Sequence, residues 1–201
     1  AFALDGTPIL TGSRDNTAKL WNLTTGELIH TFSGHTEKIT SVAISYDGST
    51  VLTGSTDNTA KLWNVSTGNV IKTFYHNEDV WSVAYSPIKT NEILTGSGAY
   101  DYFGWAGRWD IDTASVTQVI TPCCFPRIVT TAVYSPDGFY LLIGSHNWKV
   151  NLYYAATGVK IRTFEDPTPI NNARPSHSDW VFSVAFSPDG TKIIMSFAKD
   201  G

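Results

Sequence analysis

Residues 34 to 74 read GHTEKITSVAISYDGSTVLTGSTDNTAKLWNVSTGNVIKTF, and they make up one complete structural unit of the chain. The unit begins with Gly34-His35, has a Ser-Tyr-Asp-Gly segment at residues 45–48, and carries a tryptophan at residue 63. Its apolar segments each have about the length of a β-strand, roughly 5 to 6 residues. The stretch therefore predicts short strands joined by tight turns.

Part of this unit occurs a second time. Residues 9–22, shifted by 42 positions, align with residues 51–64, and only two of these 14 positions differ. The differences are Ile9 against Val51 and Arg14 against Thr56. Such similarity indicates an internal repeat, and a repeat of this length predicts a fold built from stacked copies of one unit.

The period and the motifs resemble the WD40 repeat, whose unit of about 40 to 45 residues carries Gly-His, Trp-Asp and the four strands of one propeller blade. Trp21-Asn22 and Trp63-Asn64 stand where the family has Trp-Asp, and Trp109-Asp110 matches the motif itself. The resemblance implies an all-β fold, a WD40 β-propeller segment of four-stranded antiparallel blades. It also implies a larger propeller, typically of seven blades.

The alignment divides the chain into five blades, of which the first and last are partial and the fourth is degenerate: residues 1–32, 33–74, 75–120, 121–164 and 165–201. Three, four, four, four and two strands are expected in them. Both ends of the chain fall within a repeat. We therefore expect a fragment whose flanking blades or domains belong to the same full-length chain.

In this family a His, a Ser or Thr, an Asp and a Trp form a buried hydrogen-bonded tetrad, and the resemblance places it on His35, Thr53, Asp57 and Trp63. Imidazole, hydroxyl, carboxylate and indole groups can satisfy one another in a closed network. A His, an Asp and a hydroxyl also make up a hydrolytic triad. The sequence favours the structural role, because the hydroxyl would be an interior strand side chain without an evident oxyanion hole or nucleophile elbow.

The third and fourth blades depart from the repeat. In the third, Tyr75-His76 replaces Gly-His, and residues 98–107 form an insertion with aromatic side chains at 100, 102, 103 and 105. These aromatics either form a binding surface or fold onto their own blade. In the fourth, all four tetrad positions change together, to Phe125, Ile143, Asn147 and Tyr153. Because a partly satisfied network is costly, we expect this blade to be held by packing.

Function in such a fold belongs to the face where the turns of all blades gather. By the resemblance, the positions that meet partners lie around the start of each first strand and just before the turn Asp. They are Arg14, Lys38, Thr40, Thr56, Asp79, Trp81, Tyr100, Ile128, Thr130, His146, Trp180 and Phe182. Large aromatics at positions that the scaffold leaves free are typical of interface hot spots. The alternative is that Trp81 and Phe182 fill the central channel or pack onto a neighbouring blade.

Composition excludes several classes of function. The net charge is -4 and no basic run occurs, which argues against binding to nucleic acid. No apolar run has the roughly 18 residues of a membrane span. The two cysteines, Cys123 and Cys124, are adjacent and provide neither a disulfide framework nor a zinc site. Reduced thiols predict an intracellular, cytoplasmic protein, with a strained vicinal disulfide as the alternative.

The sequence shows no metal-ligand spacing, no phosphate-binding glycine loop and no nucleophile paired with a base, so we expect neither cofactor nor catalysis. The interpretation is a non-catalytic scaffold that binds protein or peptide partners through an aromatic-lined propeller face. One alternative is a regulatory or sensor propeller of a larger multidomain protein whose catalytic domain lies outside this segment. Another is a purely structural piece that does not fold alone.

Overall fold

The computed structural model describes residues 1–2, 8–99, 104–121, 128–146, 149–165 and 180–198. Within these residues the chain forms seventeen β-strands and no helix. All strand pairs are antiparallel. The predicted all-β fold of antiparallel blades is confirmed.

Nowhere in the described ranges is there a helix with the length and hydrophobicity that crossing a bilayer requires.

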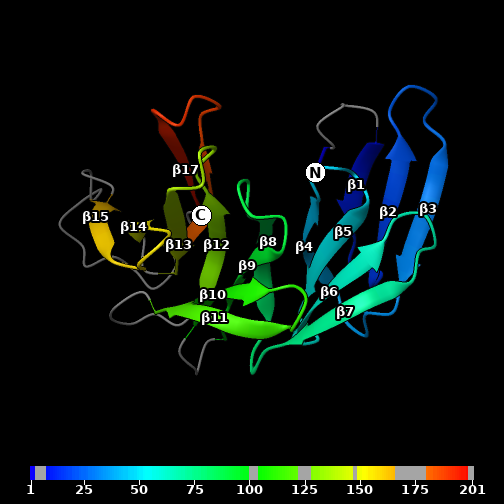
Figure 1. Ribbon diagram of the computed structural model, residues 1–201, viewed down its shortest axis with the longest axis horizontal. Coiled ribbons are helices and arrows are strands. Elements are labelled where there is room, and N and C mark those ends of the chain that lie inside the picture. Colours follow the sequence, from blue (N-terminus) through cyan, green and yellow to red (C-terminus); the bar gives the residue numbers. More distant parts are fainter. Residues whose placement is uncertain (3–7, 100–103, 122–127, 147–148, 166–179, 199–201) are drawn as a thin grey trace.

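The strands form five sheets, in which consecutive strands of the chain are neighbours, and we number these sheets blade 1 to blade 5 in chain order (Figure 1). Blade 1 consists of β1 (Pro8–Gly12), β2 (Thr17–Asn22) and β3 (Leu28–Ser33). Blade 2 consists of β4 (Ile39–Ile44), β5 (Thr50–Ser55), β6 (Thr59–Asn64) and β7 (Val70–Tyr75). Blade 3 consists of β8 (Val80–Tyr85), β9 (Glu92–Ser97), β10 (Trp105–Asp110) and β11 (Ser115–Ile120). Blade 4 consists of β12 (Val129–Tyr134), β13 (Tyr140–Ser145), β14 (Lys149–Tyr154) and β15 (Lys160–Glu165), and blade 5 of β16 (Trp180–Phe186) and β17 (Ile193–Ala198).

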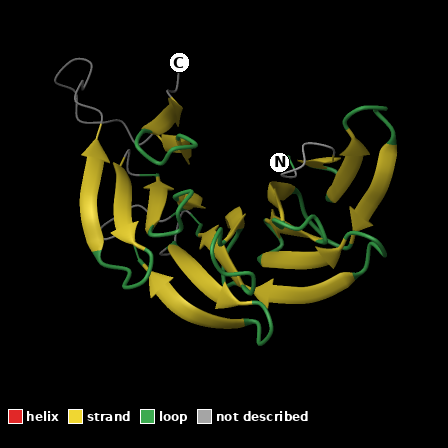
Figure 2. Ribbon diagram, turned by 45° about the horizontal axis from the view of Figure 1, so that its top comes forward, coloured by secondary structure: helices red, strands yellow, loops and turns green. Residues whose placement is uncertain are grey.

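The blades stack face to face in an arc that stays open between blade 1 and blade 5 (Figure 2). An apolar cluster lies between each pair of neighbours. Between blades 1 and 2, for example, Leu10, Leu20 and Phe32 pack with Val51 and Trp63. Blades 2, 3 and 4 therefore each pack one apolar face against the blade before and the other against the blade after.

Near the axis of the arc the blades approach so closely that only glycine fits at one position of β1, β5, β9 and β13. A Cβ atom on Gly54 would lie 2.9 Å from Val80 Cγ1, and one on Gly144 would lie 2.6 Å from Val181 Cγ1. Gly12 and Gly96 stand in the same relation to Ile39 and Val129. The glycine of the repeated Gly-Ser motif thus sets the separation of the blades at their inner ends.

Blade 4 forms although its tetrad is absent from the sequence. Ile143 and Tyr153, which replace the tetrad Thr and Trp, are both buried in the cluster between blades 3 and 4. Phe125 and Asn147, which replace the His and the Asp, lie outside the described residues. Both replacements therefore take part in the packing between blades 3 and 4.

Blades 3 and 4 are joined by a buried polar network that the sequence did not reveal. The Arg108 guanidinium on β10 donates from Nη2 to Glu92 Oε2 on β9 at 2.6 Å, and both side chains are buried. The Tyr134 hydroxyl on β12 donates to the other carboxylate oxygen at 2.8 Å. Arg108 Nη1 donates to Gln118 Oε1 at 2.8 Å and also to the carbonyl of Ala155. Burial raises the pKa of Glu92, but the hydrogen bonds from Arg108 and Tyr134 outweigh it and hold the pKa below its usual value.

We expect Glu92→Thr to lower the free energy of unfolding by about 3 to 5 kcal/mol, because it leaves the Arg108 guanidinium buried without a counter-ion. Thr50 and Leu62 occupy the equivalent positions in blade 2, where Thr50 Oγ1 bonds the Tyr85 hydroxyl at 2.9 Å. Adding Arg108→Leu should therefore recover most of the loss. Urea denaturation of both single variants and the double variant measures this. A double variant as unstable as Glu92→Thr alone would contradict the account.

Candidate partner-binding site

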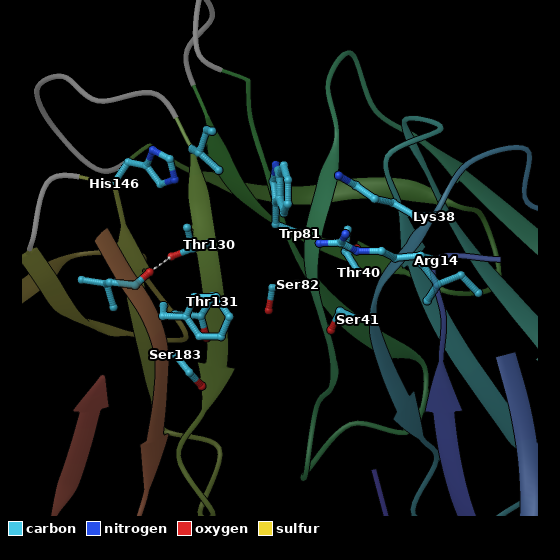
Figure 3. A pocket seen from close by; sticks show the side chains of 14 residues that line it. Arg14, Lys38, Thr40, Ser41, Trp81, Ser82, Thr130, Thr131, His146 and Ser183 are labelled. Atoms are coloured by element: carbon cyan, nitrogen blue, oxygen red, sulfur yellow. Dashed lines mark hydrogen bonds between the residues drawn. The ribbon is translucent and has the colours of Figure 1, made fainter. Parts of the chain in front are cut away.

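The concave side of the arc contains a hollow of about 470 Å³, lined by the first strands of blades 2 to 5 and by Arg14, which follows β1 (Figure 3). The side chains that line it come from successive blades at corresponding positions of the repeat. The repeat therefore gathers one small group of side chains from each blade in a single place.

A β-bulge in each first strand turns one side chain toward the hollow. The pairing between first and second strands shifts register at the same place in blades 2, 3, 4 and 5. The residues at the bulges, which have no partner in the strand register, are Thr40, Trp81, Thr130 and Phe182. All four line the hollow. Bulges commonly redirect a side chain in this way beside functional sites.

The four bulge residues act in two different ways. The hydroxyls of Thr40 and Thr130 donate to carbonyls of the next blade, those of Val80 and Val181 respectively. Trp81 instead donates from Nε1 to the Gly98 carbonyl of its own blade at 2.9 Å, and Phe182 is 70% exposed. Two of these residues therefore join blades, whereas the other two present aromatic surface in the hollow.

A second set of side chains is positioned by a repeated backbone hydrogen bond. The amide of Thr56 donates to the carbonyl of Lys38 at 3.2 Å, and the amide of His146 donates to that of Ile128 at 3.2 Å. In blade 3 the equivalent bond joins Gly98 to Asp79 at 3.0 Å. Each bond holds the residue before the first strand beside the residue after the second strand.

The charged groups in the hollow are cationic. Arg14 and Lys38 line it from the side of blades 1 and 2, and Lys38 Nζ lies 5.5 Å from the centre of the Trp81 ring (Figure 3). Asp79 is half-buried and is not a lining residue, and burial raises the pKa of its carboxyl although Lys38 lowers it. Burial lowers the pKa of His146.

Most of the residues predicted from the sequence meet in this hollow. Those that line it are Arg14, Lys38, Thr40, Trp81, Ile128, Thr130, His146 and Phe182. Thr56 and Asp79 are half-buried and do not line it. Tyr100 and the side chain of Trp180 lie outside the described residues, although the Trp180 backbone pairs with Ala198.

Sequence reasoning missed the residue that follows each bulge. Ser41, Ser82, Thr131 and Ser183 also line the hollow. Ser41 Oγ accepts from the Val83 amide at 3.1 Å, and Ser82 Oγ accepts from the Ala132 amide at 3.0 Å, so these two hydroxyls connect neighbouring blades. A hydroxyl at the same position of four repeats was the signal that could have identified them.

In blade 2 the structure brings the four tetrad residues into one network. His35 Nδ1 lies 2.7 Å from Asp57 Oδ2, and His35 Nε2 lies 2.7 Å from Thr53 Oγ1, which accepts from Trp63 Nε1 at 2.9 Å. Burial lowers the pKa of His35 although Asp57 raises it. Because the Thr53 hydroxyl is fully buried and bonded on both sides, it is not available as a nucleophile.

Among the described residues, blade 3 has a related network in which a backbone carbonyl, not a carboxylate, accepts from the histidine. His76 Nε2 lies 2.9 Å from Thr95 Oγ1, which accepts from Trp109 Nε1 at 2.8 Å, and His76 Nδ1 donates to the Phe74 carbonyl at 3.2 Å. Trp105 stacks on the His76 ring, with centroids 5.4 Å apart. This aromatic of the insertion therefore folds onto its own blade, and residues 100–103 lie outside the described residues.

We expect Thr53→Val to lower the free energy of unfolding by about 2 to 4 kcal/mol, because it leaves His35 and Trp63 with unsatisfied buried nitrogen atoms. The matched control is Thr11→Val in blade 1, where Trp21 Nε1 donates to Thr11 Oγ1 at 2.9 Å in an exposed position. That change should cost less than about 0.5 kcal/mol. Urea denaturation measures the free energy of unfolding of both variants. Equal decreases for the two would refute the claim that the buried tetrad stabilises the fold.

Stability should also depend on His76. Burial lowers the pKa of His76 from the ordinary 6.5 to about 4. Below pH 6.5 the unfolded chain binds a proton at this residue, whereas the folded chain stays neutral until the pH approaches 4. As the pH is lowered from 6.5 to 4, the free energy of unfolding should therefore decrease by up to about 3 kcal/mol because of this residue. Thermal melts across this range should show a shallower fall for His76→Gln, and parallel curves would contradict the assignment.

Comparison with known proteins agrees with this geometry. A family model described as "WD domain, G-beta repeat" matches residues 1–22, 26–64 and 168–201. The chain is 27% identical over 207 residues to eukaryotic translation initiation factor 3 subunit I of Debaryomyces hansenii, with 99% of this chain and 58% of the relative aligned. The subunit of the same name from Candida albicans is 27% identical over 205 residues, with 98% of this chain and 58% of the relative aligned.

Protein tipD of Dictyostelium discoideum is 29% identical over 205 residues, which cover 100% of this chain and 31% of that protein. The chain thus spans little more than half the length of the initiation factor subunits and about a third of tipD. The family model matches in blades 1, 2 and 5. Blades 3 and 4, which lie between the matched regions, have the same sequential strand order as blade 2. Together with the 42-residue repeat, these matches show that the chain belongs to the WD40-repeat family.

Proposed function

We propose that this chain is a non-catalytic scaffold that binds protein or peptide partners in the hollow on the concave side of its blades. The observation that carries the proposal is the contrast between constant and variable positions. The repeat keeps the glycines and strand residues that hold the blades together, whereas the bulge position and the residue before the first strand change from blade to blade. Variable side chains on a constant framework are suited to recognition.

The proposed contact residues are those predicted from the sequence: Arg14, Lys38, Thr56, Asp79, Trp81, Tyr100, Ile128, His146, Trp180 and Phe182. Trp81 and Phe182 would supply most of the affinity, because large rings that become buried are the usual hot spots of interfaces. The blades would hold these rings in place before binding and so lower the entropy that binding costs. The proposed division into blades is 1–32, 33–74, 75–120, 121–164 and 165–201.

The relatives support a role in a protein assembly. Two of them are named as a subunit of eukaryotic translation initiation factor 3, and we propose that this chain likewise works with other proteins, in the cytoplasm. A second proposal is a regulatory propeller of a larger protein. It is favoured by tipD, of which the matched region makes up only 31%.

The test places a photoreactive benzoylphenylalanine at Phe182 or, as a matched control, at Phe139, which is 65% exposed but does not line the hollow. We expect irradiation in cell extract to give protein adducts at position 182 that do not form at position 139. Because Phe182 is exposed, its replacement should change the melting temperature little. Adducts that are identical at both positions, or absent at 182, would refute the proposed site. Mass spectrometry of the adducts identifies the partner.

A further inference from the structure

We infer that the hollow binds an acidic peptide segment of a partner protein, one in which carboxylates flank an apolar side chain; this inference rests on the proposed function. The first support is the distribution of charge. The whole chain has 18 acidic and 14 basic residues and a net charge of -4. Among the described residues, however, the lining includes Arg14 and Lys38 and no Asp or Glu. An acidic chain thus has a locally cationic hollow, which favours an anionic ligand.

Both cations are available to a ligand. In the part of the chain that the structure describes, neither Arg14 nor Lys38 belongs to an ion pair. The Lys38 ammonium lies over the face of Trp81, so the two lining side chains are held beside each other (Figure 3). The N–H groups of the ammonium that point away from the ring can still donate hydrogen bonds to a carboxylate.

The rest of the lining favours a peptide over a small anion. Trp81 is half-buried and Phe182 is 70% exposed, so both rings offer apolar surface to a ligand. Arg14 and Lys38 belong to the blade 1 and blade 2 side of the hollow, whereas Phe182 belongs to β16 of blade 5. A ligand that contacts both sides therefore needs carboxylates and an apolar side chain within one short segment.

Two other ligand classes fit less well. A nucleic acid backbone is bound by many cations along a path, and two cations in one hollow of an acidic chain do not provide such a path. A methylated lysine would seek the face of an aromatic ring. The Trp81 face is already covered by the Lys38 ammonium, which would repel a second cation.

The test measures fluorescence anisotropy of three labelled peptides of equal length with the whole chain. One is rich in glutamate with a central leucine, and in the other two lysine or glutamine replaces glutamate. We expect only the glutamate peptide to bind, with a Kd that rises as salt screens the opposite charges. Equal binding of the lysine or glutamine peptide would overturn the inference, as would tighter binding of a single-stranded RNA oligonucleotide.

Charge reversal supplies the matched control. Arg14→Glu should raise the Kd of the glutamate peptide about tenfold or more. Lys160→Glu makes the same change in net charge on the exposed outer strand β15 and should leave the Kd within about twofold. Arg14 is exposed, so both variants should keep the melting temperature of the original chain. An Arg14→Glu variant that binds as well as Lys160→Glu would overturn the inference.

Failure of this inference can be told apart from failure of the proposed function. If protein adducts form at position 182 and Arg14→Glu does not reduce them, the hollow binds proteins but not through acidic segments. If no adducts form at position 182 and the glutamate peptide does not bind, both proposals fail.

Discussion

The close approach of neighbouring blades near the axis is the constraint on which the rest of the structure depends. Where Gly54 faces Val80 and Gly144 faces Val181, there is no room for a side chain on the glycine. This closeness brings Thr40 and Thr130 within hydrogen-bond reach of carbonyls on the next blade. It also draws the bulge residues of four blades around one hollow. The binding surface is therefore a product of the same packing that holds the sheets together.

Much of this fold could be predicted from the sequence because the repeat is so regular. The match between residues 9–22 and 51–64 made the strands and their order predictable. The positions of Arg14, Lys38, Trp81 and Phe182 in one hollow followed from counting along the repeat. This prediction is possible because residues at equivalent positions of the repeat occupy equivalent positions in successive stacked blades.

The remaining features depend on contacts that a period cannot reveal. Glu92 and Tyr134 belong to different blades, and because the repeat has Thr50 and Tyr85 at the equivalent positions, it gives no sign of a buried ion pair there. Among the described residues, His76 Nδ1 bonds the Phe74 carbonyl, and a partner from the backbone cannot be read from residue types. Similarly, the alignment across the insertion predicted Tyr100 as the contact residue equivalent to Thr56. In the structure, the backbone hydrogen bond that Thr56 makes in blade 2 is made in blade 3 by Gly98.

The near-identity of blades 1 and 2 also has a consequence for how the chain finds its native arrangement. Two interchangeable segments can each pack against the wrong neighbour during folding, because their apolar faces are almost the same. The buried Glu92–Arg108–Tyr134 network has a single correct partner surface, since only blade 4 supplies Tyr134. A misordered stack would leave this buried ion pair without the Tyr134 hydroxyl and the Ala155 carbonyl, at a cost of about 1 to 3 kcal/mol for each polar group left unsatisfied. This interface thus favours the native order of the blades over a misordered one.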